Sequence, residues 1–316
     1  MNEHDSDDAV CVRALGGDET FDAGAAYARF RSRAAQRNRR LPFAIGGLVA
    51  AAVIAVLAIF APLSSIAHDF LTIFQPKQFA AVDVSGYASG KKHLNVFPNL
   101  GDFGTMHDVL KGKMIHPASA AAASKAAGFR LVAPASLPSE ITDAPHYRTM
   151  GKSVESFTFS AARAAASSAK AGKTLPAMPV GLDGTTITAS LGPVVVTTWG
   201  GKERRLVVMQ GVAPVVRSSG ATLAELEGYL LSLPSIKPEL ADQIRSIGDP
   251  STTLPVPIMA VKQSSHPVDV NGAAGLGIGD NTGLGAGVVW ERDGKIYAVF
   301  GTLSEDQVMG VATGLR

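Results

Sequence analysis

One uncharged stretch of the sequence restricts what the rest of the chain can be. Residues Leu41 to Leu63, LPFAIGGLVAAAVIAVLAIFAPL, contain no charged side chain. As a helix rising about 1.5 Å per residue they would extend roughly 35 Å, more than the ~30 Å hydrocarbon core of a bilayer. A soluble helix of this length normally has a polar stripe, and a signal peptide has a shorter apolar region nearer the N-terminus. The sequence therefore predicts an uncleaved transmembrane helix over 41–63.

The residues before this stretch predict its orientation. The basic flank consists of Arg29, Arg31, Arg33, Arg37, Arg39 and Arg40, whereas the first charged residue after the stretch is Asp69. Arginines beside a span resist translocation. We therefore expect a protein of the inner (cytoplasmic) membrane, with its N-terminus inside and its C-terminal part outside. Setting this topology, with contacts to anionic lipid heads, explains the arginines better than a docking role does.

The chain divides into four expected segments. Residues 1–40 form a cytoplasmic tail that we expect to be largely disordered, because its first 22 residues hold seven acids and one arginine. The transmembrane helix follows at 41–63, a juxtamembrane linker at 64–78, and an extracytoplasmic domain at 79–316. A cytoplasmic protein partner of the tail is left open.

Hydrophobic patterns across 79–316 alternate between the strand and the helix period, which predicts an α+β domain with packed helices. TTITASLGPVVVTTWGGKERRLVVMQ reads as a three-stranded meander interrupted by Gly-Pro and Gly-Gly. TLAELEGYLLSLP reads as an amphipathic helix with Leu223, Leu226, Leu230 and Leu233 on one face. LPVPIMA, residues 254–260, reads as an extended connection.

The closing segment carries the strongest local signals. GVVWERDG and KIYAVFG flank Asp293-Gly294, the strongest short hairpin signal. Ser304 and Gln307 have the spacing of a capping box, and Leu303 and Val308 that of a hydrophobic staple. We predict that Trp290 packs the hairpin onto the helix that follows it.

The same residues resemble a known family. The run W-x-x-D-G-x-x-Y-x-x-x-G-x-L-S comprises Trp290, Asp293, Gly294, Tyr297, Gly301, Leu303 and Ser304. It is similar to the C-terminal signature of a bacterial extracytoplasmic domain of unknown function, found on single-span proteins beside anti-sigma factors and envelope-stress regulators. GFRLVAPASLP and VDVNGAAGL resemble earlier phrases of that domain. Relatives that resemble periplasmic lipoprotein carriers imply a curved antiparallel sheet with helices on one side. The resemblance supplies no catalytic residue.

Catalytic, cofactor and metal motifs are not evident. His93, His107 and His116 fall in one loop-rich stretch, but scattered surface histidines are the better interpretation of them. His4 and Cys11 do not complete the zinc pattern of anti-sigma domains. The glycine-rich run GAAGLGIGDNTGLGAGVVW leads into a strand rather than a helix, which argues against a dinucleotide fingerprint. We expect a flexible loop there, whose Gly275–Gly287 region could form a mobile lip over an apolar groove.

These observations favour a non-enzymatic function without cofactor or metal. The first hypothesis is a membrane-anchored sensor or anti-sigma-like regulator in signal transduction at the cell envelope. The alternative is an envelope carrier or assembly factor that binds a lipid or lipoprotein chain in a groove of the outer domain. The net charge of +2 predicts no strong attraction to nucleic acid.

Overall fold

The computed structural model describes residues 70–87, 100–172, 174–201 and 204–316, all within the compact unit Pro42–Arg316. Of these residues, 40% lie in strands and 22% in helices, and five α-helices occur among them. The described part of the chain is therefore mostly sheet, and the expected α+β class is wrong in this respect. Strands occur throughout the described ranges, and the helices between them have at most 11 residues.

The transmembrane part of the expected fold class is also corrected. No helix in the described ranges is long and apolar enough to cross a membrane, since the longest is α5, with 11 residues (Ala161–Ala171). The stretch 41–63, the six arginines before it and the tail 1–40 lie outside the described residues. Residues 70–78, in the range expected as a linker, contribute a strand, β1 (Leu71–Phe74), to the fold.

The strands form two large antiparallel sheets. One has five strands in the order β1-β10-β7-β6-β3, and the other has eight in the order β12-β13-β14-β15-β9-β8-β5-β4. Their remaining bounds are β3 Gly104–Leu110, β4 Met114–Ile115, β5 His146–Met150, β6 Ser153–Phe159, β7 Thr186–Leu191, β8 Val194–Gly200, β9 Arg205–Val212, β10 Val215–Ser218, β12 Gln263–Val270, β13 Ala273–Asp280, β14 Ala286–Arg292 and β15 Lys295–Gly301.

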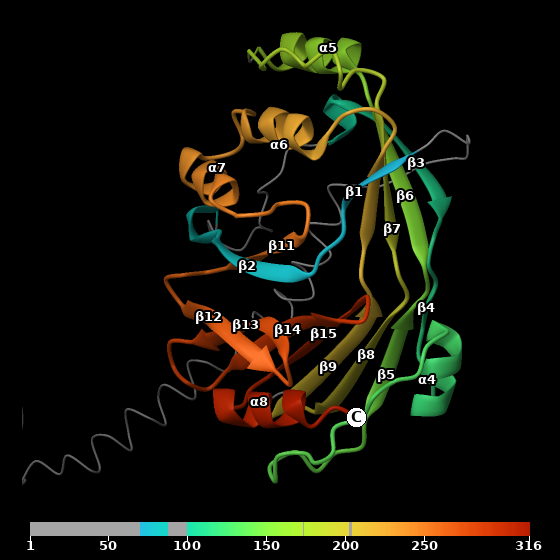
Figure 1. Ribbon diagram of the computed structural model, residues 1–316, viewed down its shortest axis with the longest axis vertical. Coiled ribbons are helices and arrows are strands. Elements are labelled where there is room, and N and C mark those ends of the chain that lie inside the picture. Colours follow the sequence, from blue (N-terminus) through green and yellow to red (C-terminus); the bar gives the residue numbers. More distant parts are fainter. Residues whose placement is uncertain (1–69, 88–99, 173, 202–203) are drawn as a thin grey trace, which may run out of the picture. The chain divides into compact units, whose positions relative to one another are not determined.

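Four stretches of chain connect the two sheets directly. β3 and β4, β5 and β6, β7 and β8, and β9 and β10 are each separated by two or three residues, and each pair has one member in either sheet. Figure 1 shows them as long strands that bend midway. The predicted meander is therefore only partly right, since β8 pairs with β9 but β7 pairs with β6 and β10.

We call these two- or three-residue connections breaks. The glycine and proline residues in them explain the bend. A Cβ on Gly112 would lie 2.2 Å from the carbonyl oxygen of Gly151, so the two edge breaks approach through their backbones. A Cβ on Gly192 would lie 2.2 Å from the Cβ of Val212, and Pro193 follows at once. Proline lacks the N–H that a ladder needs, so it interrupts the pairing where the chain leaves one sheet for the other.

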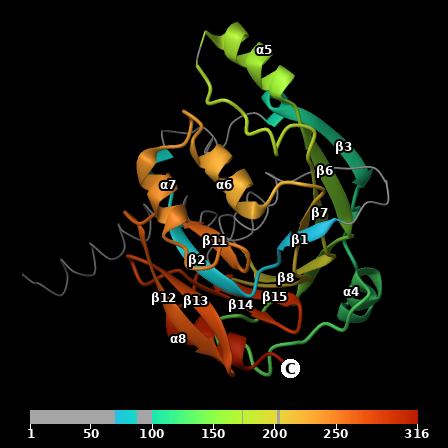
Figure 2. The same ribbon diagram turned by 45° about the horizontal axis from the view of Figure 1, so that its top comes forward.

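A third layer packs on one face of the eight-stranded sheet, which we call the inner face. β2 (Gln78–Asp83) pairs in parallel with β11 (Thr253–Ile258), and β2 contacts β13 and β14. Figures 1 and 2 show α6 (Leu223–Leu231) and α7 (Pro238–Arg245) beyond this pair. The largest hydrophobic core lies between these layers and includes Met209, Leu254, Leu276 and Phe300.

Two further helices cover the opposite, outer face. α8 (Glu305–Thr313) packs on β14 and β15, and α4 (Ala120–Ala127) packs on β5 and β8. The segment that contains Val132 crosses the outer face of the sheet beside the buried side chain of Gln210. The Val132 amide donates to Gln210 Oε1 over 2.9 Å, and Gln210 Nε2 donates to the Val132 carbonyl over 2.8 Å. One side chain thus satisfies the backbone of a segment that has no strand partner there.

The closing segment folds as predicted. β14 and β15 pair across Asp293 and Gly294, whose φ angles of 53° and 73° are those of a type I′ turn. Ser304 Oγ accepts from the Gln307 amide, and Gln307 Oε1 accepts from the Ser304 amide, which confirms the capping box. Trp290 is 2% exposed and shares a core with Leu303 and α8.

Two segments expected as loops are strands. LPVPIMA forms most of β11, and its prolines are tolerated because β11 pairs on one side only. The glycine-rich run forms β13, a strand paired on both sides with β12 and β14. The expectation of a mobile lip at Gly275–Gly287 is therefore wrong.

Candidate functional site

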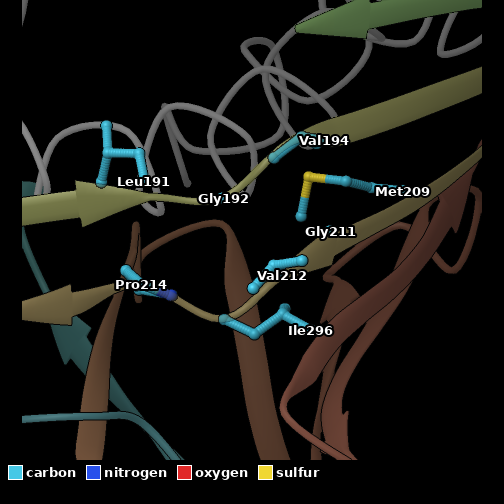
Figure 3. A pocket seen from close by; sticks show the side chains of 8 residues that line it. All are labelled: Leu191, Gly192, Val194, Met209, Gly211, Val212, Pro214 and Ile296. Atoms are coloured by element: carbon cyan, nitrogen blue, oxygen red, sulfur yellow. The ribbon is translucent and has the colours of Figure 1, made fainter. Parts of the chain in front are cut away.

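An apolar depression lies on the inner face where the strands bend. Figure 3 shows side chains from β7, β8, β9 and β15 converging on it. All the residues that line it are apolar: Leu191, Gly192, Val194, Met209, Gly211, Val212, Pro214 and Ile296. None of them is titratable, so the depression itself offers no acid, base or nucleophile.

The bend creates this depression. Leu191 ends β7 and Val194 begins β8, so the Gly-Pro break leaves a gap between their side chains. Gly211 faces the gap from β9 and contributes no side chain to fill it. Met209 and Ile296 form a buried floor, whereas Val212 at the rim is 40% exposed.

The depression is small compared with a ligand cavity. Its volume is about 40 Å³, against roughly 300–1,000 Å³ for the pockets that enclose small molecules. A ligand of ordinary size would therefore place only one end in it. The remainder would have to lie along the neighbouring surface.

That neighbouring surface is an apolar row on the inner face. Residues directly opposite each other in an antiparallel ladder share a face. The ladders pair Met114 with Met150, Met150 with Val194, Val194 with Gly211, and Gly211 with Ile296. Met114 is 52% exposed and Met150 is 36% exposed. The row thus leads from a solvent-exposed sheet edge into the depression.

The exposed edge is also basic. Along β5, Arg148 alternates with Met150 and so shares the inner face with it; both are exposed. Lys111, Lys113 and Lys152 lie at the adjoining breaks and are exposed as well. No ion pair neutralises these four cations within the part of the chain that the structure describes.

A histidine–glutamate pair lies on the outer face. His266 Nε2 and Glu305 Oε1 are 2.6 Å apart, and both side chains are 44% exposed. A Cβ on Gly277 would lie 3.0 Å from His266 Nε2, so this glycine gives the ring its space. The pair therefore ties β12 to the start of α8, which is a structural role.

Other chemistry-bearing side chains remain apart. Among the residues described, no group of three or more histidine, cysteine, aspartate or glutamate side chains could hold a metal ion. His107 and His116 are exposed on and beside the edge strands, and His93 lies outside the described residues. Tyr229 is buried on α6, which raises the pKa of its phenol, and its hydroxyl has no partner in the described ranges.

The residues that carry the family resemblance form the closing corner, away from the depression. The rings of Trp290 and Tyr297 stack on the outer face with centroids 5.4 Å apart. Burial raises the pKa of Tyr297, as do Asp293 and Glu291, against the effect of Arg292. Glu291 Oε1 accepts from the Gly294 amide over 2.6 Å, so this carboxylate fixes the turn.

Sequence reasoning missed the depression, although two signals were present. Gly192-Pro193 and Ala213-Pro214 each interrupt an apolar strand pattern, and the two breaks face each other in the fold. Gly192-Pro193 was interpreted as a turn, which would have reversed the chain, and Ala213-Pro214 was not considered. In the structure the chain continues forward into the second sheet.

Comparison with protein-family models, with curated proteins and with solved structures finds no match for this chain. The bend, the apolar row and the basic edge are therefore the features from which a function can be inferred.

Proposed function

We propose that this protein is a non-enzymatic binding protein that holds an apolar chain against the inner face of its bent sheet. One observation carries the proposal: the row from Met114 to Ile296 is apolar throughout and ends in a depression without polar side chains. Apolar ligand sites owe most of their affinity to such surface, at about 25 cal/mol for each Å² removed from water. This function corresponds to the carrier or assembly factor considered from the sequence.

The exposed methionines support this interpretation. Methionine side chains are flexible and polarizable, so they adapt to apolar partners of different shape. Met114 and Met150 oppose each other on neighbouring strands and are both accessible.

The carboxylates of the closing corner support a function other than catalysis. Glu291 accepts from the Gly294 amide, Asp293 occupies the turn, and Glu305 contacts His266. A pair of carboxylates available for acid–base chemistry is therefore not formed by these residues. The regulator hypothesis depends on the tail 1–40, outside the described residues, and stays a prediction.

The experiment measures binding of a neutral fluorescent apolar probe, N-phenyl-1-naphthylamine, to the full-length chain. We expect saturable binding that Val212→Asp weakens about tenfold, because it places a carboxylate at the apolar rim and such a loss corresponds to 1.4 kcal/mol. Val180→Asp is the matched control, since Val180 is 94% exposed and does not line the depression. Equal binding by the two variants, or no binding by the wild type, would overturn the proposal.

A further inference from the structure

The chemistry of the sheet edge indicates what kind of apolar chain would lie on the row. Arg148 and Met150 share the inner face of β5 and are two positions apart, about 7 Å in a strand. On this strand the outer-face residue Thr149 is buried under α4, whereas the inner-face residues are exposed. A ligand on the inner face would therefore meet a cation at the edge and apolar surface beyond it.

The charged residues in the chain segments that form this edge are all basic, and the nearest acids along the chain, Asp108 and Glu155, oppose each other on β3 and β6. Residues 111–139 and 144–154 contain no aspartate or glutamate, and they include Lys111, Lys113, Arg148 and Lys152. Lysines also protect sheet edges against pairing with other chains, and that role would account for the lysines alone. It does not account for an arginine on the inner face beside two exposed methionines.

The length of the row suits one acyl chain. Met150, beside Arg148 on β5, and Ile296 on β15 are three strand spacings apart, about 14 Å at roughly 4.8 Å per spacing. The acyl chain of a membrane lipid spans half of the ~30 Å hydrocarbon core, or about 15 Å. Such a chain could reach from the edge into the depression with its head group still at Arg148.

We propose that the ligand is an anionic single-chain amphiphile, whose carboxylate or phosphate binds at Arg148 while its acyl chain lies along the row toward Ile296. This inference rests on the proposed binding function and adds the polarity and direction of the ligand. The guanidinium supplies paired N–H donors that match a carboxylate or a phosphate. The neighbouring lysines add long-range attraction that salt screens.

The test displaces the naphthylamine probe from the full-length chain with three ligands of one chain length: tetradecanoate, tetradecanoyl-glycerol-phosphate and the neutral tetradecanol. We expect at least one anion to bind about tenfold more tightly than the alcohol, with an affinity that falls as salt rises. The tighter anion identifies the source as a free carboxylate or a lipid phosphate. Arg148→Gln should abolish the preference, whereas Arg217→Gln, an exposed arginine outside the row, should retain it.

The outcomes separate this inference from the proposed function. Equal affinity for tetradecanol and both anions would overturn the inference and leave apolar binding in place. Failure of the probe and of all three ligands to bind would overturn both. Displacement by an acidic extended peptide but by no amphiphile, if lost in Arg148→Gln, would show strand addition at β4 and overturn the inference.

Discussion

Gly192→Ala tests whether the bend depends on close backbone approach. The added Cβ would lie 2.2 Å from the Val212 Cβ and 2.8 Å from the Val212 carbonyl oxygen. The first distance is about 1 Å short of ordinary contact, for which the shortest separation is 3.4 Å. Both atoms belong to or adjoin the backbone, so no side-chain rotation relieves the overlap.

The expected loss follows from this overlap. Overpacking that forces a backbone shift costs about 1–3 kcal/mol of unfolding free energy. With a urea dependence of about 2 kcal/mol per M, a loss of 2 kcal/mol would lower the unfolding midpoint by roughly 1 M. Urea unfolding of the full-length chain, followed by far-ultraviolet circular dichroism, measures this change.

Gly228→Ala is the matched control. Gly228 lies in α6, is exposed, and a Cβ there would meet nothing within 4 Å. Alanine is favoured over glycine in a helix by about 1 kcal/mol, so this variant should gain stability. If Gly192→Ala kept the wild-type midpoint, or if both variants lost stability equally, the argument from close approach would be refuted.

Three further substitutions test the packing and the polar contacts, each by urea unfolding. Trp290→Ala should cost about 3–5 kcal/mol because the ring is 2% exposed, and a loss below 1 kcal/mol would contradict its role in the corner. Ser304→Ala should cost about 1 kcal/mol through loss of the cap of α8, and no change would show that the cap is dispensable. Burial alone would raise the pKa of Asp83, but hydrogen bonds from the Ser85 hydroxyl and from the Ser85 and Ala260 amides lower it. A lowered pKa in the folded state stabilises the fold above the unfolded-state value of about 3.9, so the deficit of Asp83→Asn should shrink below about pH 4, and a constant deficit would argue against an ionic contribution.

Local elements of the fold could be predicted because neighbouring residues determine them. The Asp293-Gly294 turn and the Ser304 cap each depend on a few adjacent residues. Such signals do not depend on contacts with distant parts of the chain. They can therefore be recognised from the sequence alone.

Pairing between distant segments could not be predicted in the same way. β2 and β11 are parallel neighbours although the chain between them includes most of both sheets. The glycines of β13 do not suggest a strand, yet Leu276 and Ile278 are buried on one face while Gly277 makes space for His266 on the other. Tertiary context outweighs local propensity at such positions.

The candidate site was missed for a related reason. An apolar site was expected near Gly275–Gly287, because glycine-rich runs suggest loops. The depression instead forms where breaks in two bent strands face each other, at Gly192 and Pro214. Neither break is distinctive alone, and only the register of β8 with β9 brings them together.

The most direct test of the account observes where a ligand lies. Full-length protein with ¹³C-labelled methionine methyl groups would be titrated with tetradecanoate and followed by nuclear magnetic resonance. Met114, Met150 and Met209 lie on the inner face, whereas Met309 belongs to α8, which covers the outer face. Binding along the row should produce saturable shifts at Met114, Met150 and Met209 and leave Met309 unchanged. Shifts confined to Met309, or no shift at the three inner-face methyl groups, would contradict it.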